Sequence, residues 1–191
     1  MLNTNNWNII LASQSPRRKQ LLEQLGYTFT QKSKDTDESF SKEIPQREVA
    51  AYLSKKKAAA FTGEIEQNDL IIASDTIVLI GNEILNKPSN HQEAFEMITK
   101  LSGKQHEVIT GVCLKSKEKE VSFSVSTSVF FKQLKDEEIN YYIEKYQPFD
   151  KAGAYGIQEW IGLIGVEKIE GSFYNVMGFP AKEVYEAMER F

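Results

Sequence analysis

The run Asp69–Ile80 constrains the fold more than any other stretch of this sequence. Its letters, DLIIASDTIVLI, are apolar at odd and even positions alike. A strand that is covered on both faces has this pattern, whereas a strand with one wet face alternates between apolar and polar residues. The pair Gly81-Asn82 follows and gives a turn signal. We therefore predict a central strand over this run, with other elements packed on both of its faces.

The remaining segments alternate between extended and helical patterns. Further strands are expected at 9–12, 27–33, 83–85, 105–115, 121–131 and 161–169. Helices are expected at 16–25, 44–61, 91–101, 136–146 and 180–191, with irregular segments at 147–158 and 170–179. The charged turn 116–120 predicts a hairpin between the two strands that flank it. This order is typical of an α/β protein with a mixed central sheet flanked by helices, here in a single domain over 1–191.

Asp75 interrupts the central apolar run between Ser74 and Thr76. A carboxylate in such a strand is costly unless it is paired, hydrogen-bonded or bound to a metal. One interpretation is a salt-bridged core aspartate. The other, which we favour, is a functional acid, because perturbed acids concentrate at functional sites. Thr76 points to the opposite face in a regular strand, and a bulge at this point would let both side chains approach one ligand.

The segment Ile9–Leu25 predicts a strand, a tight turn and a helix. Ser15 is a good N-cap, and Pro16 suits the first helical position. The basic residues of the first turn are Arg17, Arg18 and Lys19. The helix dipole disfavours cations at this end, and a bound anion would remove the conflict. The alternative is ordinary surface charge, which we keep for Lys19 because Glu23 lies four residues further on.

The composition excludes several classes of function. A net charge of −4 argues against a general nucleic-acid binder. The single cysteine, Cys113, allows no internal disulfide or cysteine zinc site, and we expect it to be a buried thiol. His91 and His106 are isolated, and no glycine-rich phosphate loop occurs. The remaining arginines, lysines and acids suit phosphate chemistry with a hard divalent cation, Mg²⁺ or Mn²⁺.

The N-terminal residues 1–8 are polar, and the apolar run behind them is too short for a signal peptide. No run approaches the length of a membrane span. We therefore expect no membrane partner and a cytoplasmic location.

Three further charged residues have no clear role from the sequence alone. Glu38 lies in a polar segment and, by itself, indicates a solvated surface acid. Lys57 lies in a predicted helix beside two other lysines. Lys87 precedes Pro88, which holds its backbone extended and favours a fixed, aimed cation.

Motifs along nearly the whole chain match one family in its own order. They are LASQSPRRKQLL from Leu11, ASDTIV from Ala73, NKP from Asn86, LSGKQHEVITGV from Leu101, DKAGAYGIQ from Asp150 and NVMGFP from Asn175. By these motifs the chain resembles the Maf family of nucleoside triphosphate pyrophosphatases, also called septum formation inhibitor proteins. The resemblance implies two lobes around a nucleotide-binding cleft, a divalent metal, and hydrolysis of a nucleoside triphosphate between its α and β phosphates. It also suggests a homodimer.

The resemblance assigns roles residue by residue. Asp75 corresponds to the general base, and Glu38 with Asp75 to the metal site. Residues that correspond to base specificity are Arg17, Thr76 and Gln158. Residues that correspond to substrate binding around the triphosphate are Ser13, Arg17, Arg18, Lys57 and Lys87. A free aspartate, with a pKa of about 3.9, is ionised and available as a base at neutral pH.

The GAYGIQ stretch is similar to the branch that uses dTTP and UTP, and different from the branch that acts on 7-methyl-GTP. One departure is Glu159-Trp160, where many relatives have small, glycine-rich residues. Trp160 either caps a base pocket or fills the core. Two other functions stay open: a γ-phosphatase, and a non-catalytic nucleotide-sensing regulator of cell division. Release of pyrophosphate distinguishes the predicted enzyme from both.

Overall fold

The computed structural model describes residues 7–191, which form two compact units. Unit 1 contains the residues up to 75 together with 110–125 and 178–191, and unit 2 contains 76–109 and 126–177. Each unit is compact by itself. The prediction of one domain over 1–191 stays a prediction.

The described strands form a mixed sheet with the order β2-β1-β3-β5-β6-β7, and β4 pairs with β3. The strands are β1 (Asn8–Ala12), β2 (Phe29–Lys32), β3 (Asp69–Ile80), β4 (Glu83–Leu85), β5 (Gln105–Lys115), β6 (Glu120–Phe131) and β7 (Val166–Glu170). In unit 1, β1 pairs in parallel with both β2 and β3. In unit 2, β4 runs antiparallel to β3 and β7 antiparallel to β6. The predicted mixed sheet is therefore confirmed, as are the bounds of its central strand.

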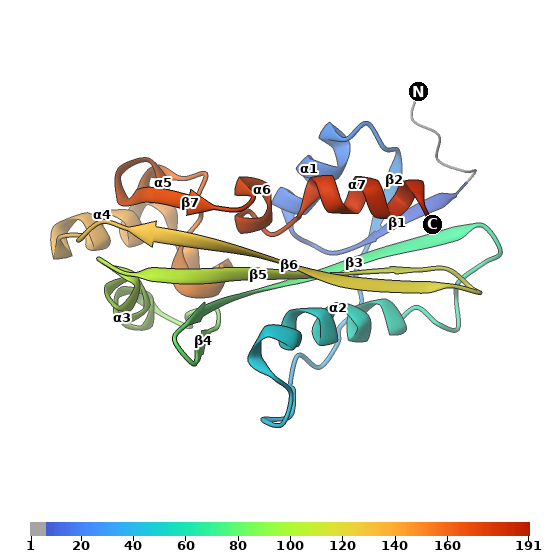
Figure 1. The fold of residues 1–191 in the computed structure, drawn as a ribbon, viewed down its shortest axis with the longest axis horizontal. Coiled ribbons are helices and arrows are strands. Elements are labelled where there is room, and N and C mark those ends of the chain that lie inside the picture. The colour runs from blue at the N-terminus through green and yellow to red at the C-terminus, as the bar shows by residue number, and fades with distance from the viewer. Residues whose placement is uncertain (1–6) are drawn as a thin grey trace. The chain divides into compact units, whose positions relative to one another are not determined.

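In unit 1, helices cover both faces of the sheet (Figure 1). The helices α1 (Pro16–Gln24) and α7 (Ala181–Glu189) lie on one side, and α2 (Val49–Ala59) lies on the other. The core on the α2 side is made of Ile10, Ala12, Ala58, Phe61, Ile71, Ala73 and Cys113. Gly111 brings α2 close to the sheet, because a Cβ at this position would lie 2.2 Å from the Ala50 carbonyl carbon. The expected burial of Cys113 is confirmed, and burial raises the pKa of its thiol to about 12.

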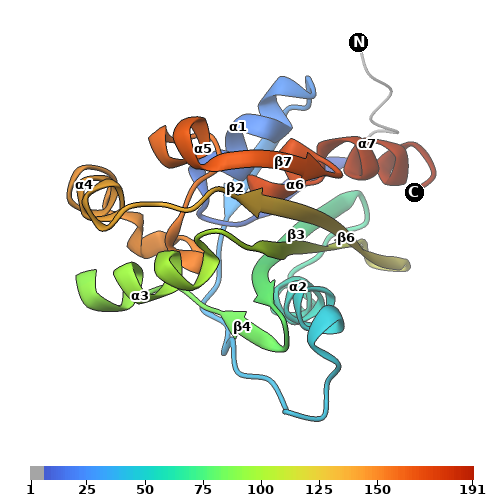
Figure 2. The same cartoon turned by 60° about the vertical axis from the view of Figure 1, so that its left-hand side comes forward.

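In unit 2, the helices α3 (His91–Leu101) and α4 (Asp136–Tyr146) lie side by side (Figure 2). Each buries an apolar stripe at helical spacing, for example Ala94 and Ile98 on α3 and Ile139 and Ile143 on α4. Two short 3-10 turns follow at 148–150 and 152–154, and then the helices α5 (Trp160–Gly165) and α6 (Phe173–Val176).

Two predictions in this region are wrong. The segment 161–169 is not one strand, because α5 occupies 160–165 and only β7 is extended. The N–H groups of Gly162 and Leu163 donate to the carbonyl of Glu159, 2.9 and 3.3 Å away, and this begins a helix. The predicted loop 170–179 contains α6, whose N-cap Ser172 accepts a hydrogen bond from the Asn175 N–H.

Two other elements are shorter than predicted. The strand expected at 27–33 is β2, over Phe29–Lys32, and the helix expected at 44–61 begins with a 3-10 turn at 46–48.

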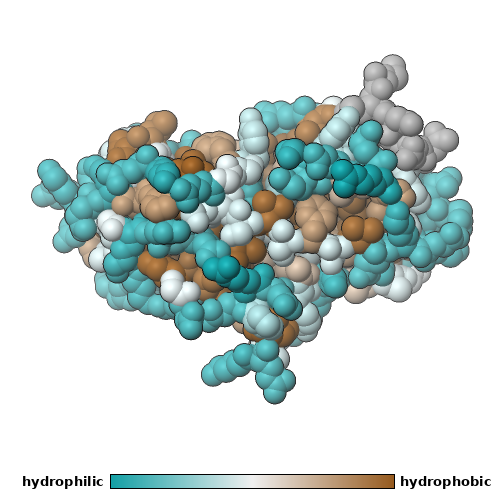
Figure 3. All heavy atoms as spheres, viewed as in Figure 1, coloured by the Kyte–Doolittle hydropathy of each residue, from teal (hydrophilic) through white to brown (hydrophobic). Residues whose placement is uncertain are grey.

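The segment before α2, at the bottom of the view, is covered with hydrophilic residues, as its sequence predicts (Figure 3). Among residues 7–191, no helix is long and apolar enough to cross a membrane.

Candidate active site

Asp75 lies on β3 and faces α2. Its side chain shares a strand face with Ile71 and Ala73, which belong to the core under that helix. Lys57, on α2, forms an ion pair with the Asp75 carboxylate. The same Nζ atom lies 2.8 Å from Oε1 of Glu38. A single ammonium group therefore bridges the two acids that the sequence assigns to a metal.

The Lys57–Asp75 pair is nearly withdrawn from solvent, whereas Glu38 is not. The side chains of Lys57 and Asp75 are 17% and 12% exposed, and that of Glu38 is 50% exposed. A buried ion pair is strongly destabilised when one partner is removed, because the other charge stays uncompensated. The interaction with Glu38 is weaker, since water screens an exposed pair.

Arg18 is fixed at the start of α1. Its N–H donates to the N-cap hydroxyl of Ser15 at 3.5 Å, which confirms the predicted cap. Its Nη1 donates to the carbonyl of Ser74 at 2.7 Å and to the hydroxyl of Ser13 at 3.3 Å. Its Nε donates to the carbonyl of Gly178 at 2.9 Å. Arg18 thus holds the backbone immediately before Asp75.

The charge of Arg18 is set by two opposing effects. Burial lowers the pKa of its guanidinium, and the negative charge of Asp75 opposes this shift. Arginine keeps its proton at neutral pH in proteins, so the group stays cationic. Its neighbour Arg17 is half-buried in the same helical turn. Lys19 pairs with Glu23 at 3.8 Å on the outer face, which confirms the surface interpretation of that lysine.

The predicted site residues divide between the two units. In unit 1, Arg18 contacts Ser13, and Lys57 contacts Glu38 and Asp75. The two groups meet at β3, where Arg18 binds the carbonyl of Ser74, the residue before Asp75. Thr76, Lys87 and Gln158 belong to unit 2. Thr76 is half-buried on β3, and Lys87 and Gln158 are exposed. Within unit 2, the Gly153 N–H donates to the carbonyl of Asn86 at 3.1 Å, which ties the loop of Gln158 to the residue before Lys87.

The sequence did not predict a polar cluster beside Gln158. The Tyr142 hydroxyl donates to the carboxylate of Glu159 and accepts a hydrogen bond from the Gly156 N–H at 3.0 Å. Lys151 lies 3.2 Å from the other oxygen of Glu159. The departure at Glu159 was the one available signal for this cluster. The interacting residues lie too far apart in the chain for local patterns to reveal them.

Trp160 and His106 pack on aromatic residues. The Trp160 ring meets that of Tyr141 edge to face, with centroids 4.8 Å apart, so Trp160 packs against α4. His106 is buried and hydrogen-bonded to the Tyr155 hydroxyl at 2.7 Å. Burial lowers the pKa of His106 from 6.5 to about 4, so the imidazole is neutral at physiological pH.

The described residues contain no group of three or more His, Cys, Asp or Glu side chains that could hold a metal ion. The pair Glu38 and Asp75 nevertheless has the right donor chemistry. Mg²⁺ is usually held by one or two carboxylates together with substrate phosphates rather than by a complete protein cage. Both carboxylates already meet at one cation, the ammonium of Lys57. These two residues therefore fit a divalent ion that a phosphate group helps to bind.

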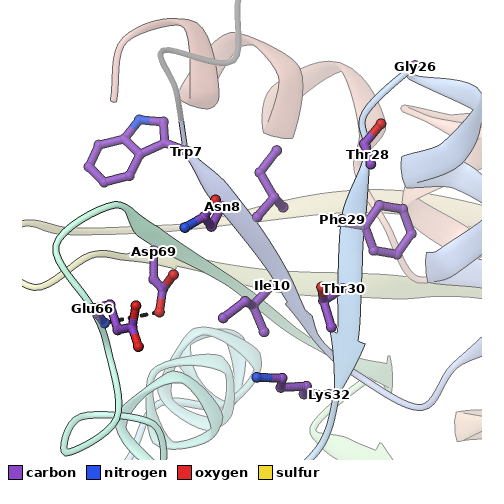
Figure 4. Close-up of a pocket in the computed structure, with 11 residues that line it drawn as sticks. Trp7, Asn8, Ile10, Gly26, Thr28, Phe29, Thr30, Lys32, Glu66 and Asp69 are labelled. Atoms are coloured by element: carbon purple, nitrogen blue, oxygen red, sulfur yellow. Dashed lines mark hydrogen bonds between the residues drawn. The ribbon is translucent and has the colours of Figure 1, made fainter.

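A separate groove of about 660 Å³ lies in unit 1 (Figure 4). Its lining residues come from β1, β2 and the segment before β3, among them Asn8, Thr30, Lys32, Glu66 and Asp69. The Asp69 carboxylate accepts a hydrogen bond from the Glu66 N–H at 3.0 Å, which closes the turn into β3. None of the predicted site residues lines this groove.

The fold and the paired charges define an α/β protein with a buried acid among basic residues at the middle of its central strand. The sequence model described as "Maf-like protein" matches residues 8–191. The chain therefore belongs to the Maf family, as its motifs predicted.

Two relatives agree with this assignment, and one solved structure shares the fold. The chain is 48% identical over 190 residues to a protein of Parabacteroides distasonis named dTTP/UTP pyrophosphatase, covering 99% of this chain and 98% of the relative. It is 50% identical over 186 residues to a protein of Cytophaga hutchinsonii with the same name, covering 97% and 85%. A HAM1 protein from Coxiella burnetii superposes with a TM-score of 0.50 at 12% identity, over 97% of this chain and 100% of that one. This last likeness concerns the fold alone.

Proposed function

We propose that this protein hydrolyses a nucleoside triphosphate between the α and β phosphates, giving a monophosphate and pyrophosphate. The observation that carries the proposal is the buried Asp75, paired with Lys57 and preceded by a carbonyl that Arg18 holds. The substrates are dTTP and UTP, by analogy with the names of the relatives at 48% and 50% identity.

Asp75 acts as the general base in this proposal. Its carboxylate, which pairs with Lys57 in the structure, takes a proton from the attacking water. Arg18 positions Asp75 through the Ser74 carbonyl, and its guanidinium adds positive charge beside the phosphates together with Arg17. Lys57 exchanges its carboxylate partners for a phosphate oxygen when the substrate arrives.

The other predicted residues have supporting roles. Ser13 and Lys87 bind the triphosphate. Thr76, Gln158 and Arg17 determine the base, and the Gln158 amide can both donate to and accept from a pyrimidine edge. Glu38 and Asp75 hold a divalent cation, Mg²⁺ or Mn²⁺, which supplies positive charge that stabilises the transition state. A homodimer, a cytoplasmic location and the absence of a nucleic-acid partner also belong to this proposal.

The test is a panel of nucleoside triphosphates incubated with the protein and Mg²⁺ or Mn²⁺, with pyrophosphate and orthophosphate measured separately. We expect pyrophosphate as the first product, and faster release from dTTP and UTP than from purine triphosphates. Orthophosphate as the first product would instead identify a γ-phosphatase. Binding of dTTP without any product would support the non-catalytic regulator.

A further inference from the structure

We propose that Tyr142, Glu159 and Lys151 form a buried clamp that positions Gln158 and thereby controls base selectivity. This inference rests on the proposed function, in which Gln158 reads the base. The three residues do not touch the substrate in this proposal. They are positioning residues that act through the short segment 156–159.

The hydroxyl of Tyr142 joins both ends of that segment. It accepts a hydrogen bond from the Gly156 N–H, two residues before Gln158, and donates one to the Glu159 carboxylate, one residue after it. The Glu159 N–H also donates to the Gly156 carbonyl at 3.0 Å. Gln158 therefore lies in a turn that is closed by its own backbone and held from outside by a single hydroxyl.

The clamp is rigid because its side chains are largely buried and each one is hydrogen-bonded or ion-paired. Tyr142 is fully buried on α4, and burial followed by the hydrogen bond to Glu159 raises the pKa of its hydroxyl, so it stays a donor. The side chain of Lys151 is 9% exposed and pairs with Glu159 at 3.2 Å and with Asp150 at 2.7 Å. The lysine compensates the negative charge of Glu159, whose side chain is only 19% exposed.

The backbone just before the segment 156–159 is strained at Ala154. Gly153, with a φ of 69°, adopts the left-handed region freely, whereas its neighbour Ala154 has a φ value of 60° in this region, which non-glycine residues rarely adopt. Such a conformation persists only where surrounding contacts hold it. Here Tyr155 is anchored to His106, and Gly153 to the Asn86 carbonyl. The strain and the clamp together indicate that one conformation of this loop is required.

The close approach of side chains to Gly156 points to Gln158 as the group being positioned. A Cβ on Gly156 would lie 2.9 Å from Nε2 of Gln158 and 2.9 Å from Cδ of Glu159. The Gln158 amide thus rests directly against the residue that Tyr142 holds. Displacement of Gly156 or Glu159 is expected to move this amide.

The primary test is Tyr142→Phe, which removes the hydroxyl and keeps the ring. We expect the KM for dTTP and UTP to rise about tenfold, with turnover at saturation within about twofold, as for loss of a hydrogen bond that aids binding only. Selectivity for pyrimidine over purine triphosphates should fall by a similar factor. Tyr141→Phe is the matched control, because that neighbouring hydroxyl bonds to the Lys145 side chain. An unchanged KM in a folded Tyr142→Phe protein would overturn the proposal.

Two further experiments separate positioning from general destabilisation. Glu159→Ala should reproduce the KM effect, and Glu159→Gln, which still accepts from Tyr142, should restore most of the loss. In a Gln158→Ala background, Tyr142→Phe should raise the KM no further. An additive effect in that background would show that the hydroxyl does not act through Gln158.

A measurement without turnover distinguishes failure of this inference from failure of the proposed function. Hydrogen exchange of the amides at 156–159 should be faster in Tyr142→Phe than in the wild type, and unchanged in Tyr141→Phe. Unchanged exchange in both variants would overturn the clamp even if the enzyme is active. Faster exchange in a protein that releases no pyrophosphate would keep the clamp and reject the proposed activity.

Discussion

Asp75 in unit 1 and Glu159 in unit 2 are carboxylates of similar burial, with side chains 12% and 19% exposed. Their partners differ. Asp75 pairs with Lys57, whose flexible stem also reaches the exposed Glu38. Glu159 also pairs with a lysine, Lys151, but it accepts in addition a hydrogen bond from a fully buried tyrosine hydroxyl, which itself accepts from the Gly156 N–H. A lysine can exchange one anion for another, whereas a buried tyrosine cannot easily do so.

This difference separates a reacting acid from a supporting one. The pairing of Asp75 can be replaced when a triphosphate offers its oxygens to Lys57, so the acid becomes available for proton transfer. The hydrogen bond from the Tyr142 hydroxyl to Glu159 has no such replacement, and it holds a backbone segment in place. Two carboxylates of comparable burial can therefore have different roles, one in proton transfer and one in holding the backbone.

The largest effect is expected for Asp75→Asn. The amide cannot take the proton from water, so turnover should fall by about 10³-fold while dTTP still binds. Pyrophosphate release and calorimetric titration of dTTP measure the two quantities. Asp69→Asn on the same strand is the control, because the Asp69 carboxylate accepts a hydrogen bond from the Glu66 N–H in the turn before β3. Near-normal turnover by Asp75→Asn would remove Asp75 from the mechanism.

Lys57→Met should have the next largest effect. It removes positive charge from the phosphates and leaves Asp75 without its ammonium partner, so kcat/KM should fall by about 10²-fold. Lys56→Met is the matched control, since the neighbouring lysine pairs with the exposed Asp37 at 3.0 Å. Its kcat/KM should change by less than about twofold, as for an exposed pair. Equal losses in both variants would contradict a specific role for Lys57.

Protonation of His106, which anchors the Gln158 loop through Tyr155, should lower the stability of the protein in acid. The folded pKa of about 4 lies below the usual 6.5, so the unfolded chain binds more protons between these values. Stability is therefore expected to fall as the pH drops through this window, by about 2 kcal/mol between pH 7 and pH 5. Urea unfolding across this range provides the measurement.

His106→Gln should flatten this pH dependence, although it lowers stability at pH 7 through lost packing. His91→Gln is the control, because His91 is exposed at the start of α3 and should leave the slope unchanged. A slope that persists in His106→Gln would assign the acid sensitivity to other groups.

The smallest effect is expected for Gly156→Ala. The new methyl group meets the ends of the Gln158 and Glu159 side chains, which can shift, so the protein should still fold. The KM for dTTP should rise by about fivefold, equivalent to roughly 1 kcal/mol of overpacking. Gly63→Ala is the control, because nothing lies within 4 Å of a Cβ at that position. Unchanged steady-state kinetics in Gly156→Ala would indicate that the Gln158 amide is not held where the clamp places it.

Much of the fold could be predicted because its signals are local. The apolar run of β3, the Ser15-Pro16 start of α1 and the burial of Cys113 each follow from a few adjacent residues. The segment 161–169 could not be assigned in this way, because a short run rich in isoleucine and glycine suits either a strand or a buried helix. The folded chain forms α5 there, and it brings Gly162 so close to Ile157 that a Cβ on Gly162 would lie 1.8 Å from the Ile157 carbonyl oxygen.

The sequence by itself determined the family, the central strand and the presence of an acid where an apolar residue is expected. It could not show which cation balances that acid, because Lys57 looked like one of three equivalent lysines on a helix. Only the tertiary structure showed that Lys57 pairs with Asp75 and that Arg18 donates to the carbonyls of Ser74 and Gly178. It also showed that the Tyr142 hydroxyl binds the segment that contains Gln158. The physical reason is that a buried charge or polar group must find a partner wherever the folded chain offers one, and sequence distance does not limit that choice.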